Sequence, residues 1–282
     1  MPELPEVETT RRGIAPRAIG NIVAGVDIFD GRLRWPVPSA LGAALEGRQL
    51  TRIDRRSKYL LFRCEHAGDK SSDSVVTMLV HLGMTGSLRW YERGTAPPRR
   101  LHDHVDIRFR DGALLRYHDP RRFGAILRVD DPVAGHPLLS ELGPEPFDGA
   151  FNAAALRAKL RSRTAAIKLA LMDNHVVVGV GNIYANEALF HAGIRPTHAA
   201  NRISLERLGK LVEAVRATLA KAIEKGGSTL RDYVGSSGEP GYFQLDYYAY
   251  GRGGLPCRIC GTTMRAARQG GRASAWCPRC QT

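Results

Sequence analysis

The sequence contains no long apolar run and no apolar stretch at its start. None of its apolar segments reaches about 18 residues, so no segment is predicted to cross a membrane. It begins Met-Pro-Glu-Leu-Pro-Glu, which is acidic and predicts that no signal peptide is present. Apolar residues still make up 43% of the 282, enough to bury a core, and this excludes a disordered chain. Together these features predict a cytoplasmic globular protein of roughly two domains.

Acidic residues are too few to balance the basic ones. There are 41 Lys and Arg against 28 Asp and Glu, which gives a net charge of +13, and only seven of the 41 are Lys. An isoelectric point near 9.9 predicts a polyanionic partner. The preference for Arg favours bidentate contacts with phosphates or base edges. A basic but unspecialised surface is the alternative that charge alone leaves open.

The chain has five cysteines, and four of them are regularly spaced. Cys257, Cys260, Cys277 and Cys280 follow the pattern C-x2-C-x16-C-x2-C, which is typical of a zinc ribbon. Two C-x2-C turns supply a tetrahedral shell of four thiolates, so we expect one structural Zn²⁺ and no catalytic role for it. Two disulfides are the alternative, which a cytosolic protein disfavours. Cys64 lies in an apolar run and is expected to be a small buried residue.

The first 130 residues are mostly short alternating runs separated by Gly, Pro and Asp. This pattern predicts a two-layer β-sandwich or a barrel. One helix precedes the strands, with Pro5 and Glu6 in its first turn and Pro16 at its end. The expected strands are residues 22–28, 58–64, 74–81, 87–91, 105–109, 114–117 and 125–129.

A Pro- and Gly-rich stretch near residues 130–148 marks a domain boundary, and the next part is helical. A short helix over residues 183–192 is ended by Gly193. A longer one starts at Ser204 as its N-cap and carries an apolar stripe from Leu205 to Ile223. The connection of about a dozen residues predicts a helix, two turns and a helix.

Two hairpin tips carry large apolar residues beside glycine. Met84 lies in Gly-Met-Thr-Gly, and Phe123 follows two arginines in Asp-Pro-Arg-Arg-Phe-Gly. In a basic protein such tips fit wedges that enter between base steps, and Arg121 could hydrogen-bond an exposed base edge. The alternative is that Met84 and Phe123 fold back into the sandwich core.

The turn at residues 179–182, Gly-Val-Gly-Asn, leads directly into a helix. Its glycines permit close approach of a ligand, and a helix N-terminus offers N–H groups to a phosphate. An ordinary turn with Asn182 as the N-cap explains the same residues. The histidines at 102, 104 and 118 form no recognised metal-binding arrangement, and structural roles are favoured for them.

The N-terminus can supply a nucleophile. Removal of Met1 leaves a secondary amine on Pro2, of which roughly a tenth is neutral at pH 7. Such an amine can attack an electrophilic sugar carbon and form an iminium, and Glu3 could move protons to the sugar ring. The alternative is that Pro2, Pro5 and Glu6 only start a helix.

Linked motifs occur along nearly the whole chain. They are Pro2–Glu8, Ser57–Leu61, His81–Gly86, Asp119–Gly124, Gly179–Tyr184, Gly227–Arg231, Tyr250–Arg252 and Cys277–Gln281. In this order they resemble the motifs of bacterial formamidopyrimidine-DNA glycosylases, which are 8-oxoguanine DNA glycosylases. The resemblance implies an α+β, multidomain protein that acts on double-stranded DNA containing oxidised bases or abasic sites. It would excise oxidised purines and then cleave the strand by β,δ-elimination.

The resemblance also implies residue roles. The catalytic set is Pro2 as nucleophile, Glu3 as acid and base, and Lys58 and Arg272 at phosphates beside the lesion. Glu6 would support the lesion pocket. Further residues would contact DNA: Met84, His104, Arg121, Phe123 and Asn182.

The implied domains are a β-sandwich catalytic domain with flanking helices (1–131), a helix–two-turn–helix domain (132–241) and a zinc finger (242–282). A lid is expected over about 227–241, and the protein is expected to be a monomer.

Two departures from the family pattern stand out. Ser57 replaces the usual Gly before Lys58, and Ala-Ser-Ala follows Arg272 in place of Gly-Thr-His. Two other functions remain open: an endonuclease VIII that prefers oxidised pyrimidines, and a zinc-ribbon DNA-binding protein without catalysis.

Overall fold

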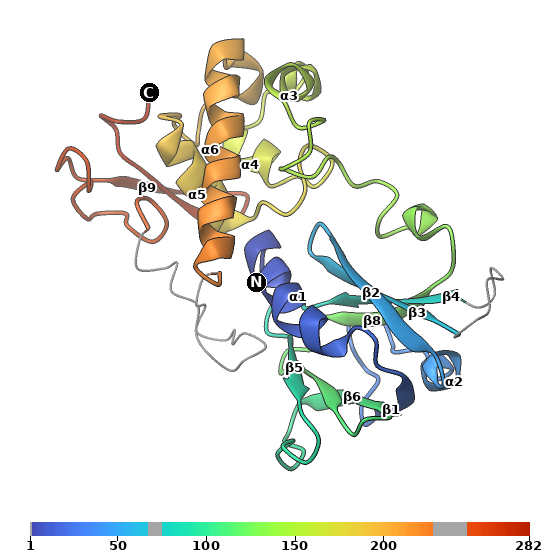
Figure 1. Ribbon diagram of the computed structural model, residues 1–282. Helices are drawn as coiled ribbons and strands as arrows, with labels where there is room; N and C mark the ends of the chain where they lie inside the picture. Colours follow the sequence, from blue (N-terminus) through green and yellow to red (C-terminus); the bar gives the residue numbers. More distant parts are fainter. Residues whose placement is uncertain (1, 67–74, 228–246) are drawn as a thin grey trace. The chain divides into compact units, whose positions relative to one another are not determined.

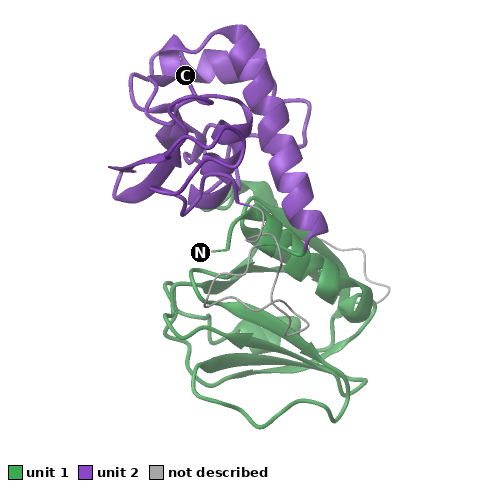
Figure 2. Cartoon of the chain, turned by 90° about the vertical axis from the view of Figure 1, so that its left-hand side faces the viewer, with its two compact units in different colours: residues 1–140, 226–242 green, residues 141–225, 243–282 purple. Residues whose placement is uncertain are grey.

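The computed structural model describes residues 2–66, 75–227 and 247–282 (Figure 1). The chain forms two compact units, coloured separately in Figure 2. Unit 1 contains residues 1–140 and 226–242, and unit 2 contains residues 141–225 and 243–282. The zinc-finger segment therefore shares a unit with the helices that precede it. The lid expected over residues 227–241 lies outside the described residues except for Gly227.

Unit 1 is a sandwich of two antiparallel four-stranded sheets. The first has the order β1-β6-β7-β5 and the second β2-β3-β4-β8. Alternate side chains of both sheets point into one core, as in β3, where every second residue is buried. The predicted β-sandwich is confirmed, and the barrel is excluded. The strands are β1 (Val23–Ile28), β2 (Gln49–Arg56), β3 (Tyr59–Glu65), β4 (Val75–His81), β5 (Ser87–Tyr91), β6 (Asp103–Phe109), β7 (Leu114–His118) and β8 (Ala125–Val129).

Short helices flank the sandwich. The first, α1 (Leu4–Ala18), contacts strands of both sheets, namely β2, β3 and β5, while α2 (Leu41–Leu45) packs on β1. A 3₁₀ turn, η2 (Val133–Gly135), follows the last strand. Pro5 lies in the first turn of α1 as predicted, but the helix continues past Pro16 by two residues. Pro16 has no N–H to donate to the Arg12 carbonyl, so it removes one helical hydrogen bond, and the helix ends two residues after it.

Unit 2 combines helices with one hairpin. The helices are α3 (Ala153–Leu160), α4 (Ile167–Leu171), α5 (Asn182–His191), the 3₁₀ turn η3 (Ala200–Arg202) and α6 (Leu205–Glu224). The strands β9 (Arg265–Gln269) and β10 (Arg272–Trp276) pair antiparallel. Ser204 caps α6 as predicted, its hydroxyl accepting a hydrogen bond from the Arg207 N–H. The apolar stripe is buried from Leu208 to Leu219, whereas Leu205 is 44% exposed.

All seven predicted strands match the structure within two residues, and α5 and α6 lie where they are expected. The elements not predicted are α2, β2, α3, α4 and the β9–β10 hairpin. β2 escaped because three of its eight residues are arginines, which interrupt the apolar alternation. Along the described ranges, no helix is long and apolar enough to cross a membrane.

Candidate active site and nucleic-acid interface

Three residues of the predicted reaction centre lie together at the start of α1. Pro2 is buried, Glu3 is 3% exposed and Glu6 is fully buried. Glu3 is the N-cap, and its N–H donates to Glu6 Oε2 over 2.7 Å in a capping box. This bond fixes the backbone beside Pro2 relative to the helix. Gly227 lies against the same carboxylate, since a Cβ there would be 3.2 Å from Glu6 Oε1.

Lys58 lies in the two-residue turn between β2 and β3 and is 7% exposed. Ser57 before it has a φ of +56°, in the left-handed region that favours glycine. This left-handed turn is a physical reason for the glycine expected before Lys58, because glycine adopts it without steric strain. The Ser57 carbonyl accepts a 3.0 Å hydrogen bond from Arg55 Nη1.

Glu8 connects α1 to the turn that carries Lys58. It is 8% exposed, and its carboxylate is paired with Arg11, Arg12 and Arg55. Burial alone raises the pKa of Glu8, but the hydrogen bonds from Arg11 and Arg12 outweigh it and lower that pKa. Because Arg55 also donates to the Ser57 carbonyl, one guanidinium joins the helix to the Lys58 turn.

The two hairpin tips lie in contact. A Cβ on Gly83 would be 2.4 Å from the Gly124 nitrogen, and one on Gly124 would be 1.7 Å from the Tyr117 hydroxyl. Glycine is therefore required at both positions. Met84 and Phe123 line one hollow of about 350 Å³ together with Arg34, His81 and Gly83.

The exposures of the tip residues differ. Phe123 is 45% exposed and Arg121 is exposed, with its guanidinium carbon 4.9 Å from the centre of the Phe123 ring. Met84 is half-buried. The fold-back alternative does not describe Phe123, which projects from the sandwich.

Asp119 holds the second tip in shape and was not predicted from the sequence. Its side chain is fully buried. It accepts hydrogen bonds from Thr85 Oγ1 (2.6 Å), the Gly124 N–H (2.9 Å), the Arg121 N–H (3.3 Å) and the Tyr117 hydroxyl (3.3 Å). Since Thr85 belongs to the first tip and Arg121 to the second, one carboxylate organises both.

His104 lies beside the hydrogen-bonded cluster around Asp119. It is 2% exposed, and its Nε2 lies 2.8 Å from the Asp119 carbonyl oxygen. This places its ring inside the sandwich, so the expected DNA contact of His104 stays a prediction. Its neighbour His102 is half-buried, has a φ of +73°, and its Nδ1 has no hydrogen-bond partner among the described groups.

His81 is the titratable group of the hollow at the tips. Burial, together with the nearby charges of Lys58 and Arg34, lowers the pKa of His81 to about 4. Its Nδ1 accepts a 3.0 Å hydrogen bond from the Gly83 N–H. The ring is therefore neutral at physiological pH. Tyr59, the residue after Lys58, pairs with His81 across β3 and β4, so the Lys58 turn lies at the same end of the sheet as the first tip.

In unit 2, Asn182 is the first residue of α5, and its N-cap is Gly181 rather than Asn182 itself. The side chain is half-buried, and its Oδ1 has no hydrogen-bond partner among the described residues. Gly179 adopts a φ of +78°, which the turn before the helix requires. Asn182 is thus free to use its side chain outside the helix cap.

Arg272 is exposed at the start of β10. The residues after it are firmly held, because the buried Lys168 Nζ donates to the Ala273 carbonyl (2.6 Å) and to Ser274 Oγ (2.8 Å). Ser274 Oγ in turn donates to Gln269 Oε1 over 2.7 Å. The departure from the family pattern after Arg272 therefore has its own anchor.

The four predicted zinc ligands come together. Their sulfur atoms all lie within 4.8 Å of one another, and every cysteine is free of disulfides. N–H groups of Ile259 and Cys280 point at the sulfurs of Cys257 and Cys277, as in metal-binding knuckles. Four thiols at this separation fit one tetrahedral structural Zn²⁺ with no open position. The disulfide alternative is excluded.

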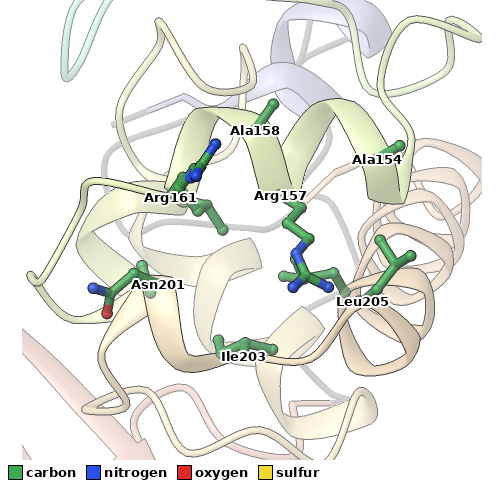
Figure 3. Close-up of a pocket in the computed structure, with 10 residues that line it drawn as sticks. Ala154, Arg157, Ala158, Arg161, Asn201, Ile203 and Leu205 are labelled. Carbon is green, nitrogen blue, oxygen red and sulfur yellow. The ribbon is translucent and has the colours of Figure 1, made fainter.

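A second hollow, of about 620 Å³, lies between α3, η3 and the start of α6 (Figure 3). Arg157 points across it toward Leu205 and Ile203. Its described lining contains no carboxylate, thiol or imidazole, so it offers no acid–base chemistry. It is lined by Ala154, Arg157, Ala158, Leu160, Arg161, Ala200, Asn201, Ile203, Leu205 and Leu208.

Comparison with known proteins accounts for nearly the whole chain. Residues 1–126 match the formamidopyrimidine-DNA glycosylase N-terminal domain, and residues 142–234 match the H2TH domain of the same enzymes. Residues 254–282 match the zinc finger found in FPG and IleRS. A formamidopyrimidine-DNA glycosylase of Burkholderia vietnamiensis is 55% identical, with 100% of both chains covered. The chain belongs to the formamidopyrimidine-DNA glycosylase family.

Solved glycosylases of this family share the fold. The Lactococcus lactis Fpg in complex with DNA containing N7-benzyl-Fapy-dG is 34% identical, with a TM-score of 0.87 and 100% of each chain covered. The same species' Fpg with abasic-site DNA is 32% identical, with a TM-score of 0.87 and 99% of each chain covered. The sandwich, the helical domain and the four-cysteine finger of this glycosylase were all predicted from its sequence.

Proposed function

We propose that this chain, a bifunctional DNA glycosylase and AP lyase of its family, runs its reaction through Pro2 and Glu3. It removes oxidised purines from double-stranded DNA and cleaves the strand at the abasic site. The observation that carries the assignment of residues is the position of Pro2 at the N-terminus, next to two buried carboxylates in a fixed capping box. Burying two carboxylates costs free energy, and a helix start alone does not require it, so their position beside a potential amine favours a catalytic role.

The reaction follows from the chemistry of a secondary amine. After Met1 is removed, the Pro2 nitrogen forms a bond to the sugar C1′ while the bond from C1′ to the base breaks and the base takes up a proton. Glu3 gives a proton to the ring oxygen, and the ring opens to an iminium. The iminium makes the C2′ proton acidic, so its removal expels the 3′ phosphate, and a second elimination expels the 5′ phosphate.

The remaining residues bind and deform the duplex. Lys58 would bind the phosphate beside the lesion, with Asn182 and Arg272 on neighbouring phosphates. Met84, Arg121 and Phe123 would occupy the space left by the flipped base, which a glycosylase must extract to reach the glycosidic bond. Support comes from the contact between the two tips and from the exposure of Arg121, Phe123 and Arg272.

Zinc would hold the finger that carries Arg272, through Cys257, Cys260, Cys277 and Cys280. We further propose that the protein acts as a cytoplasmic monomer, where the four thiols remain reduced for the metal.

The substrate preference is tested by measuring single-turnover base release from two duplexes, one with 8-oxoguanine opposite cytosine and one with thymine glycol. Faster release of 8-oxoguanine is expected. Preference for thymine glycol would instead favour the endonuclease VIII specificity. Tight lesion binding with no base release from either duplex would favour a binding protein without catalysis.

A further inference from the structure

Asn186 occupies a special position in unit 2. It lies in the second turn of α5 and is 1% exposed. Its Nδ2 donates a 2.6 Å hydrogen bond to the Asn182 carbonyl oxygen, and its Oδ1 accepts a 3.1 Å bond from the Ala275 N–H. One side-chain amide therefore joins the first residue of α5 to strand β10.

The two ends of this bridge carry phosphate contacts in the proposed function. Asn182 itself is one of them, and Arg272 starts the strand in which Ala275 lies three residues later. A phosphate contact depends on position, because the spacing of phosphates along a strand is fixed. The Asn186 bridge thus sets the relative position of Asn182 and Arg272, which must contact the same DNA backbone.

Only a side chain with one donor and one acceptor satisfies both ends. An aspartate would turn a second acceptor toward the Asn182 carbonyl, and a leucine of similar size would leave the buried Ala275 N–H without a partner. The amide is therefore required for its hydrogen bonds and not only for its volume.

Other contacts keep the finger attached when the bridge is removed. Lys168 holds Ala273 and Ser274, and the Glu187 carboxylate accepts hydrogen bonds from the N–H groups of Tyr248, Ala249 and Tyr250. Loss of the Asn186 amide is thus expected to change the register of Arg272 against Asn182 without detaching the finger.

We propose that Asn186 is a positioning residue that keeps Asn182 and Arg272 in the register needed to bind neighbouring phosphates. This inference rests on the proposed function. It predicts that the side chain acts on DNA binding through Asn182 and Arg272, and that it has no contact with the reacting sugar.

The test compares Asn186→Leu and Asn186→Asp with Leu160→Ala, a control that opens a cavity elsewhere in unit 2. Binding is measured by fluorescence anisotropy with a duplex containing a tetrahydrofuran abasic analogue, from 50 to 300 mM KCl. Both Asn186 variants are expected to bind about tenfold more weakly. The slope of log K against log salt should decrease in magnitude by about 0.9, the value for one lost phosphate contact. Leu160→Ala should lose stability and keep both values.

A double mutant separates positioning from general damage. In an Asn182→Ala background, Asn186→Leu should weaken binding less than about twofold further, because the register then has no second contact to serve. Full multiplication of the two effects, or unchanged affinity and salt slope in Asn186→Leu, overturns the inference.

The proposed function is tested separately on the unmodified chain. If the unmodified chain releases 8-oxoguanine and Asn186→Leu binds the abasic-analogue duplex with the same affinity and salt slope, the inference alone has failed. If the unmodified chain releases no base, the failure lies with the proposed function.

Discussion

Truncating Asp119 should lower the stability of unit 1 and weaken insertion of the proposed wedge residues Met84, Arg121 and Phe123 into the duplex. Four donors converge on its buried carboxylate: Thr85 Oγ1, the N–H groups of Arg121 and Gly124, and the Tyr117 hydroxyl. In Asp119→Ala the Thr85 hydroxyl and the Gly124 N–H lose their acceptor, whereas the Arg121 N–H keeps Thr85 Oγ1 at 3.2 Å and the Tyr117 hydroxyl keeps the His81 carbonyl at 3.3 Å. A hydrogen bond to a charged group contributes about 1.5–3 kcal/mol, but the four share one carboxylate and do not add. We therefore expect a loss of about 3–5 kcal/mol in the free energy of unfolding, which corresponds to two such bonds left without an acceptor.

Two variants calibrate this loss. Asp119→Asn keeps one acceptor oxygen but turns an NH₂ group toward one pair of donors, so a smaller loss of about 2 kcal/mol is expected. Asp130→Ala removes an exposed carboxylate whose ion pair with Arg128 is on the surface, and it should cost less than about 1 kcal/mol.

The measurement is urea unfolding followed by tryptophan fluorescence, in which the buried Trp90 reports on unit 1. A 2-aminopurine next to an abasic analogue in the duplex reports wedge insertion, and its signal should fall in Asp119→Ala. Stability of Asp119→Ala within about 0.5 kcal/mol of the unmodified protein, with a normal 2-aminopurine signal, would refute the role of the carboxylate.

Four further outcomes are expected. The pKa of His81 is lowered to about 4 in the folded chain against about 6.5 unfolded. As pH falls from 6.5 toward 4, the unfolded chain takes up a proton on His81 before the folded chain does. The free energy of unfolding is therefore unaffected by this group above pH 6.5 and decreases by at most about 3 kcal/mol toward pH 4. Thermal melts of His81→Asn between pH 7.5 and 4.5 should show a flatter dependence, and an unchanged profile would contradict this. Chelation, or Cys260→Ser, should release one zinc per chain and weaken DNA binding, because the finger holds Arg272; full affinity without zinc would count against that role. Ser57→Gly should change stability by less than about 1 kcal/mol, since relief of left-handed strain is offset by glycine's unfolded-state entropy. Gly83→Ala should lose more than that in urea titrations, because its Cβ would lie 2.4 Å from the Gly124 nitrogen.

Features formed by residues close together in the sequence were predicted from it. The two C-x2-C pairs, the alternating strands and the apolar stripe of α6 each involve neighbouring positions, so the periodicity of a strand or helix reveals them. The tips at Met84 and Phe123 were found in the same way, from a large apolar residue beside glycine.

The groups that support the site were not predicted because their partners are distant in sequence. Thr85 and Asp119 are 34 residues apart, Glu8 and Arg55 are 47 apart, and Asn186 and Ala275 are 89 apart. No local pattern marks such pairs, since each partner alone is an ordinary polar residue. The burial of His104 is a similar case, because its acceptor is a backbone carbonyl in another strand's turn.

The central claim, that the Pro2 amine attacks the sugar, is tested by borohydride trapping with a duplex containing 8-oxoguanine. Borohydride reduces an iminium to a stable amine, so it joins enzyme and DNA only if that intermediate forms. The account predicts a covalent adduct that maps to Pro2 by mass spectrometry and disappears in Pro2→Gly or when Met1 is retained. An adduct on another residue, or base release that persists with Met1 in place, would contradict it.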